Sequence, residues 1–396
     1  MPIRWTPASI GRESDLKGKA KMIHENRALR GADRILGSIH PHAGKMRRRS
    51  LIVAVTAATI AWGSAGIAQT VAALPAGGMV FTADEYSSTL SRIDLASGDV
   101  TTAPATIVPH NVQISPDGSL LLAVGLAAGG GDEHGGEQTP GSMEGMEGAG
   151  ELVLFDPQDL AAGPMAHIPV GMHPAHVITD IDGKRAFVTN AEDDTLSVID
   201  LASREVIATV ATGDYPHGQR TSPDGRVIWV ANVNSGNVSV VDTSTLKEVA
   251  RIDVGVTPVQ VGFLPDGSRV YVSLRDKNSV AVIDTKTQTV IATVEVGRGP
   301  IQLNATPDGR FVYVANQGTE AIPDDTVSVI DVATNSVTAT IRTGSGAHGV
   351  AVSGDGKDVF VANMFDGTVS VIDVASQTVL ANIPVGKGAS GITYRP

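Results

Sequence analysis

The sequence contains no cysteine, although it is 396 residues long. Without thiols the chain cannot form disulfides, thiolate metal sites, a cysteine nucleophile or the covalent attachment of a c-type haem. It also lacks the Gly-x-Ser-x-Gly elbow, the His-Glu-x-x-His zinc motif and the glycine-rich phosphate loop. These absences favour a protein that is not an enzyme, but they do not exclude catalysis by other residues.

An excess of basic residues is also missing. The chain has 42 Asp and Glu against 30 Lys and Arg, and a formal net charge of −12. Because the first 68 residues are basic, the remainder is more acidic than the whole chain. An acidic surface repels polyanions, so we do not expect nucleic-acid binding. An unidentified small ligand or protein is the expected partner.

Long hydrophobic runs are confined to the N-terminal region. Residues 46–68 have a basic start at Arg47–Arg49, an apolar stretch at 51–62 and small residues near Ala68. This pattern predicts a secretory signal peptide, leaving a mature chain without a membrane span in the periplasm or outside the cell. Arg48 and Arg49 leave open twin-arginine export beside the general secretory route. Residues 1–45 then form a disordered leader or follow from a mis-assigned start codon.

The rest of the chain is built from a repeat. Asp-Gly recurs at 117, 182, 224, 266, 308 and 355 with a usual spacing of about 42 residues. One unit, residues 255–296, contains four short runs rich in β-branched residues, separated by turn-forming residues. Such a unit predicts a sheet of four antiparallel strands, which needs neighbouring sheets to bury its faces.

The two ends of the repeat region are complementary. Residues 78–103 match the second, third and fourth strands of a unit but lack the first. Residues 386–394 match a first strand, after which the chain ends. We therefore predict an all-β, seven-bladed β-propeller over residues 78–396. Its ring would be closed by the C-terminal strand pairing with the N-terminal three.

Four units carry a further signature, Phe-Val-Thr-Asn, Trp-Val-Ala-Asn, Tyr-Val-Ala-Asn and Phe-Val-Ala-Asn, ending at residues 190, 232, 316 and 363. In this the chain resembles the YVTN family of bacterial β-propeller repeats. The resemblance implies the propeller fold. It does not select a function, because similar propellers serve as surface-layer proteins, binding scaffolds, lactonases and accessory domains of redox enzymes.

Two units are longer than the others. A Gly-rich insertion lies at residues 125–150 and a shorter one at 317–325, each between the second and third strands. In an antiparallel meander this loop shares a face with the connector from one blade to the next. Both insertions should therefore lie beside the connectors.

The connector is rich in histidine at the start of the innermost strand. We expect a ligand site at this mouth of the channel, formed by the residues His110, His176, His217, His348, Gln260, Gln302 and Arg220. Four imidazoles could hold a divalent metal or, when protonated, an anion. Since successive strand residues point to opposite faces, His176 could instead point away from His110 and His217. The alternative is that Pro-His is only a repeat consensus that packs between blades.

The first insertion offers a second metal candidate. His134, Met143 and Met146 combine an imidazole with two thioethers, a donor set that suits Cu(I). The alternative is a solvated Gly-rich flap in which these residues have no metal role.

The sequence thus predicts an exported, monomeric binding scaffold that requires no cofactor, with a divalent metal or copper as possible additions. A metal-assisted hydrolase or lactonase, or a periplasmic copper-binding protein, are the alternatives.

Overall fold

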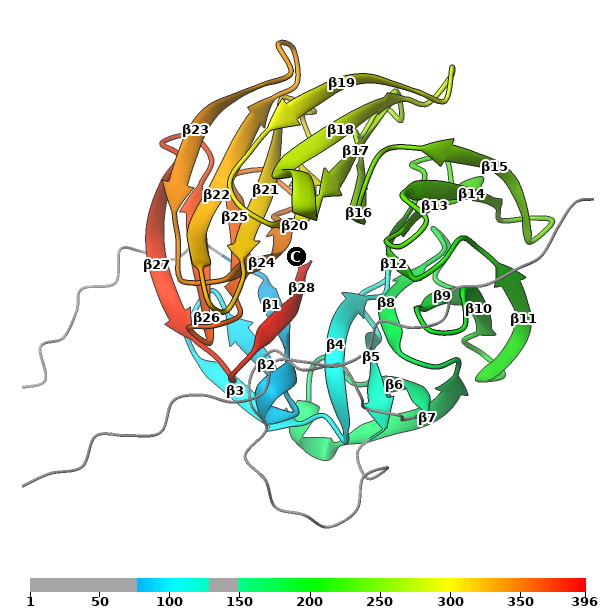
Figure 1. Cartoon of the computed structure of the whole chain (residues 1–396). Helices are drawn as coiled ribbons and strands as arrows, with labels where there is room; N and C mark the ends of the chain where they lie inside the picture. The colour runs from blue at the N-terminus through cyan, green and yellow to red at the C-terminus, as the bar shows by residue number, and fades with distance from the viewer. Residues whose placement is uncertain (1–76, 128–148) are drawn as a thin grey trace, which may run out of the picture. The chain divides into compact units, whose positions relative to one another are not determined.

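The computed structural model describes residues 77–127 and 149–396, which form seven four-stranded sheets around a central channel (Figure 1). The predicted leader, the signal peptide and most of the 125–150 insertion lie outside these residues. No helix in the described part of the chain is long and apolar enough to cross a membrane.

The strands of each blade follow one another outward from the channel. The innermost strands are β4 (Ile107–Ile114), β8 (Pro174–Thr179), β12 (Pro216–Thr221), β16 (Pro258–Phe263), β20 (Pro300–Ala305), β24 (Ala347–Val352) and β28 (Ala389–Arg395). The second strands are β1 (Met79–Asp84), β5 (Leu121–Ala127), β9 (Arg185–Asn190), β13 (Val227–Asn232), β17 (Arg269–Leu274), β21 (Phe311–Gly318) and β25 (Asp358–Asn363).

The outer half of each blade has the same order. The third strands are β2 (Thr89–Asp94), β6 (Gly150–Phe155), β10 (Thr195–Asp200), β14 (Asn237–Asp242), β18 (Ser279–Asp284), β22 (Pro323–Asp331) and β26 (Thr368–Asp373). The fourth strands are β3 (Val100–Pro104), β7 (Pro164–Val170), β11 (Glu205–Ala211), β15 (Lys247–Asp253), β19 (Thr289–Glu295), β23 (Ser336–Arg342) and β27 (Thr378–Pro384). Short 3₁₀ helices are η1 (Glu85–Ser87), η2 (Leu160–Ala162) and η3 (Arg275–Lys277).

The predicted ring closure is confirmed. β28 pairs antiparallel with β1, with Met79 opposite Arg395, so the last strand completes the sheet begun by the first three (Figure 1). This pairing gives the first blade the same four strands as the other six.

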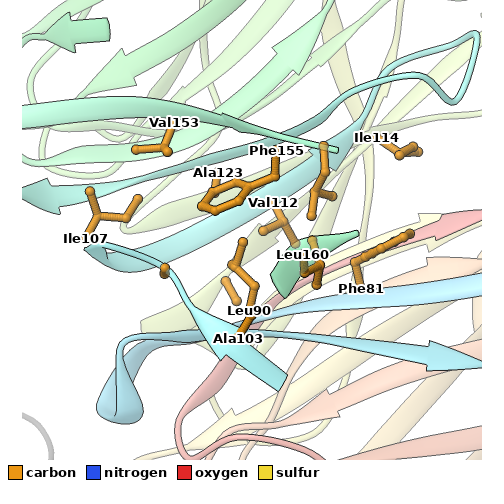
Figure 2. Close-up of a cluster of buried hydrophobic side chains, with 13 residues drawn as sticks. Phe81, Leu90, Ala103, Ile107, Val112, Ile114, Ala123, Val153, Phe155 and Leu160 are labelled. Carbon is orange, nitrogen blue, oxygen red and sulfur yellow. The ribbon is translucent and has the colours of Figure 1, made fainter. Parts of the chain in front are cut away.

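The core lies between the blades. One cluster joins Phe81 and Leu90 of the first blade to Ile107, Leu121 and Phe155 of the second, and all five are fully buried (Figure 2). Burying an aromatic or aliphatic side chain of this size contributes about 1.5–3 kcal/mol. Because every sheet packs against two neighbours, strands that are apolar on both faces become stable.

The repeated asparagine ties the second strand to the third. Asn232 Nδ2 donates to Asn237 Oδ1 at 2.8 Å and to Ser239 Oγ at 2.9 Å. A Cβ added at Gly213, in the preceding connector, would overlap this amide. The asparagine and the connector glycine therefore form one packing unit, which explains why both recur in the sequence.

The two longer units are built differently at their insertions. β5 and β6 pair up to Leu126 and Gly150, so the first insertion joins second and third strands as predicted. The 317–325 segment is not a separate loop, because Gly318 pairs with Pro323 and the segment lengthens β21 and β22. From the sequence alone, a longer hairpin at residues 317–325 could not be distinguished from an inserted loop.

Candidate functional site

The innermost strands begin with a β-bulge at the end of the channel that the connectors enter, called here the connector end. On β8, Pro174 pairs with Asn190 and Val177 with Val188, so Ala175 and His176 together face one residue. Such a bulge breaks the alternation of side chains. His176 lies two residues after Pro174, and the bulge therefore lets it approach His217, which lies one residue after the equivalent Pro216.

Four imidazoles meet at the connector end, and we call them the histidine cluster: His110 on β4, His176 on β8, His217 on β12 and His348 on β24. The ring centre of His110 lies 5.4 Å from that of His217, 6.0 Å from His348 and 6.1 Å from His176. His176 and His217 are 4.9 Å apart. The alternation argument against His176 was wrong, because the bulge places it among the others.

Three of the rings are oriented by hydrogen bonds through Nδ1. His217 donates to the Val259 carbonyl at 3.2 Å and His348 to the Ser390 carbonyl at 2.8 Å. His110 donates to the Glu85 carboxylate at 2.9 Å. In a neutral ring whose Nδ1 donates such a bond, Nε2 is the nitrogen with a free lone pair. Metal-binding histidines are commonly fixed in this way by a carboxylate or carbonyl.

The inward-facing nitrogens are buried without partners among the described residues. His110 Nε2 and both ring nitrogens of His176 have no hydrogen bond there. One nitrogen from each of His110, His176 and His217 lies within 4.8 Å of the other two. A buried polar atom without a partner is costly, so such a convergence points to a ligand that satisfies it.

Burial keeps three of the four imidazoles, His176, His217 and His348, neutral at pH 7. Desolvation, reinforced by neighbouring imidazoles, lowers the pKa of His176 and of His217 well below the usual value. The same causes lower the pKa of His348 to about 4. Burial alone would raise the pKa of Glu85, but its hydrogen bond to His110 and nearby imidazoles lower it overall. The cluster thus combines three neutral imidazoles with the His110 ring and the buried carboxylate to which it is hydrogen-bonded.

Other polar residues continue the ring on the blades between His217 and His348. Gln260 on β16 and Gln302 on β20 are buried at the position equivalent to His176. The Nε2 atom of each amide has no hydrogen-bond partner among the described residues. Both glutamines therefore lie at the connector end, as predicted.

Arg220 does not join the histidine cluster. It lies three residues beyond His217 on β12 and lines a cavity of about 320 Å³ formed by the last residues of the inner strands. We call this the turn end of the channel, because the Asp-Gly turns follow there. Its charge still reaches His176, where it contributes to the lowered pKa. The sequence predicted one site at one mouth of the channel, but the residues lie in two separate regions, with Arg220 apart from the histidines.

Sequence reasoning missed Glu85. It is 4 % exposed and begins η1, directly after Asp84, which stands where other blades have the signature asparagine. An acidic residue next to that position was the available signal. The other predicted metal ligands, His134, Met143 and Met146, lie outside the described residues.

Comparison with known proteins identifies one family. The sequence profile of the family described as Cytochrome D1 heme domain matches residues 148–271 and 265–391, more than half of the chain. No curated protein sequence matches the chain.

Solved structures share the fold at low identity. Hydrazine synthase from Kuenenia stuttgartiensis is 22 % identical, with a TM-score of 0.58, and the match covers 72 % of this chain and 89 % of that one. A Bacteroides uniformis protein provisionally assigned as a 6-phosphogluconolactonase is 16 % identical (TM-score 0.62; 80 % and 99 %). Dihydro-heme d1 dehydrogenase NirN, in complex with DHE, is 15 % identical (TM-score 0.56; 80 % and 75 %). These likenesses establish the propeller architecture alone.

Proposed function

The chain belongs to the cytochrome D1 heme domain family, and from that premise we propose that it is a binding propeller whose channel holds a transition-metal ion directly on protein imidazoles. The site would consist of His110, His176 and His217, with His348 as a fourth donor nearby. The observation that carries the proposal is the convergence of three ring nitrogens within 4.8 Å of one another.

The donor chemistry favours a borderline metal. Neutral imidazoles suit Zn²⁺, Cu²⁺, Ni²⁺ and Co²⁺, whereas Ca²⁺ and Mg²⁺ prefer oxygen ligands. A tetrahedral zinc ion with Zn–N distances of about 2.0–2.1 Å needs nitrogens about 3.3 Å apart. Nitrogens that lie within 4.8 Å of one another would have to approach by up to about 1.5 Å to reach that geometry.

The cluster does not fit the haem that the family name implies. A macrocycle fills the equatorial plane of its iron and leaves two opposite axial positions. Three imidazoles that converge on one point cannot all occupy two positions. A bare ion would accept all three and would satisfy Nε2 of His110 and one of the two partnerless nitrogens of His176, so we attribute the site to an ion.

Export is part of the proposal. The predicted signal peptide at 46–68 would deliver the chain to the periplasm or beyond. There a cysteine-free imidazole site tolerates an oxidising environment.

Hydrolysis is the second candidate. Three histidines that leave a fourth position for water resemble the donor set of catalytic zinc sites. This candidate expects the metal-loaded protein to open lactones. The hydrolase candidate requires that lactone hydrolysis is lost in His217→Gln. It also requires that the protein is inactive after the metal is removed.

Metal binding is tested with protein stripped by a chelator. Zn²⁺, Cu²⁺ and Ni²⁺ are titrated by calorimetry, and retained metal is measured by elemental analysis after gel filtration. We expect one ion per chain, and none in the double variant His110→Gln, His217→Gln. His167→Gln is the matched control, because His167 is exposed and contacts Glu151 away from the cluster.

Two results would contradict the proposal. One is that none of the three metals, Zn²⁺, Cu²⁺ and Ni²⁺, binds with a stoichiometry of one ion per chain. The other is a haem absorption band on titration with haem that depends on His110 or His217, while added ions do not bind. A parallel Cu(I) titration of a variant lacking residues 129–148 separates capture by the predicted His134–Met143–Met146 site from binding at the histidine cluster.

A further inference from the structure

The turn end of the channel contains a second, chemically opposite region. Half of the residues that line the cavity of about 320 Å³ there have side chains that can donate hydrogen bonds, namely Gln113, Thr179, Arg220, Thr221, Asn304 and Thr393, and most of the others are apolar. None of the described residues that line it is acidic. A polar cavity with a cationic group and no carboxylate is complementary to an anion.

Among the described residues that line the cavity, Arg220 alone is charged. Its guanidinium donates one hydrogen bond, from Nη1 to the Gln219 carbonyl at 3.0 Å. It forms no ion pair with any described residue, and desolvation alone lowers its pKa to about 10. The guanidinium is therefore charged at neutral pH, removed from much of the solvent, and has no compensating carboxylate. Holding a charge in this way is unfavourable unless a counter-charge binds.

The propeller provides an internal comparison for this position. The equivalent residues on the neighbouring blades are Gly262 on β16, Asn304 on β20 and Ile178 on β8. Each of these blades is a four-stranded sheet with the same strand arrangement. The repeat therefore does not need an arginine to fold, which distinguishes Arg220 from a structural element of the blade.

We propose that the turn end binds a small oxyanion, in which a carboxylate or phosphate group accepts paired hydrogen bonds from the Arg220 guanidinium. The planar guanidinium matches two oxygens of such a group. Amide and hydroxyl donors of Asn304 and Thr393 would contact its remaining oxygens. The cavity is larger than one phosphate, so the group belongs to a small organic acid or a phosphorylated metabolite as readily as to an inorganic ion.

This inference is independent of the metal site. The histidine cluster lies at the start of the inner strands, and the cavity at their ends. Loss of anion binding would leave the metal proposal standing, and the reverse also holds.

The test is calorimetric titration of the metal-free full-length protein with inorganic phosphate, sulfate and citrate. We expect at least one of them to bind with one-to-one stoichiometry. Arg220→Gln should weaken that binding at least tenfold, and Arg220→Lys should restore part of it. Arg226→Gln is the matched control, because Arg226 lies in the same blade with a largely exposed side chain. It should bind as the unchanged protein does.

The inference is overturned if none of the three anions binds, or if Arg220→Gln binds them as tightly as the unchanged protein. A loss shared by Arg226→Gln would also overturn it, because it would indicate a general charge effect. If Arg220→Gln fails to fold, crystals of the unchanged protein soaked in selenate decide. An anomalous peak beside the Arg220 guanidinium supports the site, and a selenate-containing crystal without one refutes it.

Discussion

The two ends of the channel are built from the same seven strands but carry opposite chemistry. The connector end gathers imidazoles and one buried carboxylate, His110, His176, His217 and Glu85 among them. The turn end has a cationic Arg220 and neutral donors. The difference shows that a repeat fixes the backbone, while residues that depart from the repeat give each end its own chemistry, suited by our proposals to a cation at one end and an anion at the other.

The double variant His110→Gln, His217→Gln tests the difference between the two ends most strongly. We expect metal affinity to fall by at least about 1,000-fold, because two of three ligands are lost. Phosphate or citrate binding at Arg220 should be unchanged. Calorimetry of both ligands on one protein preparation measures both quantities. Parallel loss at both ends would mean that the variant has damaged the fold.

The pH dependence of the free energy of unfolding tests whether His348 at the connector end is buried in its neutral form. An unfolded histidine takes up a proton near pH 6.5, whereas folded His348 does so near pH 4. The contribution of neutral His348 to the stability of the folded state is therefore complete above pH 6.5. It is lost as the pH falls from 6.5 to 4. One such group contributes about 3 kcal/mol.

Urea unfolding of the metal-free protein at several pH values measures this effect. The free energy of unfolding should fall between pH 6.5 and 4, and less steeply in His348→Gln. The exposed His167→Gln should retain the original slope. An identical slope in the two variants would show that His348 is not buried in its neutral form.

Glu85 allows a smaller change at the connector end. Its carboxylate orients His110 through Nδ1 without belonging to the converging nitrogens. Replacement by glutamine should weaken metal binding about 10–100-fold, the usual effect of losing an orienting partner. Unchanged affinity in Glu85→Gln would remove Glu85 from the site.

The smallest expected effect tests how far the two ends are independent. The charge of Arg220 contributes to the low pKa of His176, but only after desolvation and two imidazoles. Arg220→Gln should therefore change metal affinity at pH 7 by less than about threefold, since His176 is neutral there in either protein. A larger change would mean that the two ends act as one site.

The fold was accessible from the sequence because its determinants are local and repeated. Turn residues, β-branched runs and the signature asparagine recur in successive units, and the complementary chain ends predicted closure by β28. The 317–325 hairpin was not distinguishable from a loop, because strand length there depends on pairing across Gly318 and Pro323.

The site was only partly accessible. Histidine spacing placed His110, His217 and His348 at one end, but a strict two-residue period argued against His176. The bulge that reverses this is a tertiary feature of the strand pairing. Arg220 was assigned to the wrong end because its position on the same inner strand was taken to place it with His217, although three strand residues separate the two by about 10 Å. Glu85 was missed because its contact with His110 joins residues of different blades.

The central claim is that three imidazoles from consecutive blades hold one ion. An anomalous difference map from a crystal of zinc-loaded protein, recorded on both sides of the zinc edge, tests it most directly. The account predicts one strong peak about 2.0–2.1 Å from Nε2 of His110, Nε2 of His217 and one ring nitrogen of His176. A fully loaded crystal whose zinc lies elsewhere, with these rings unchanged, would contradict it.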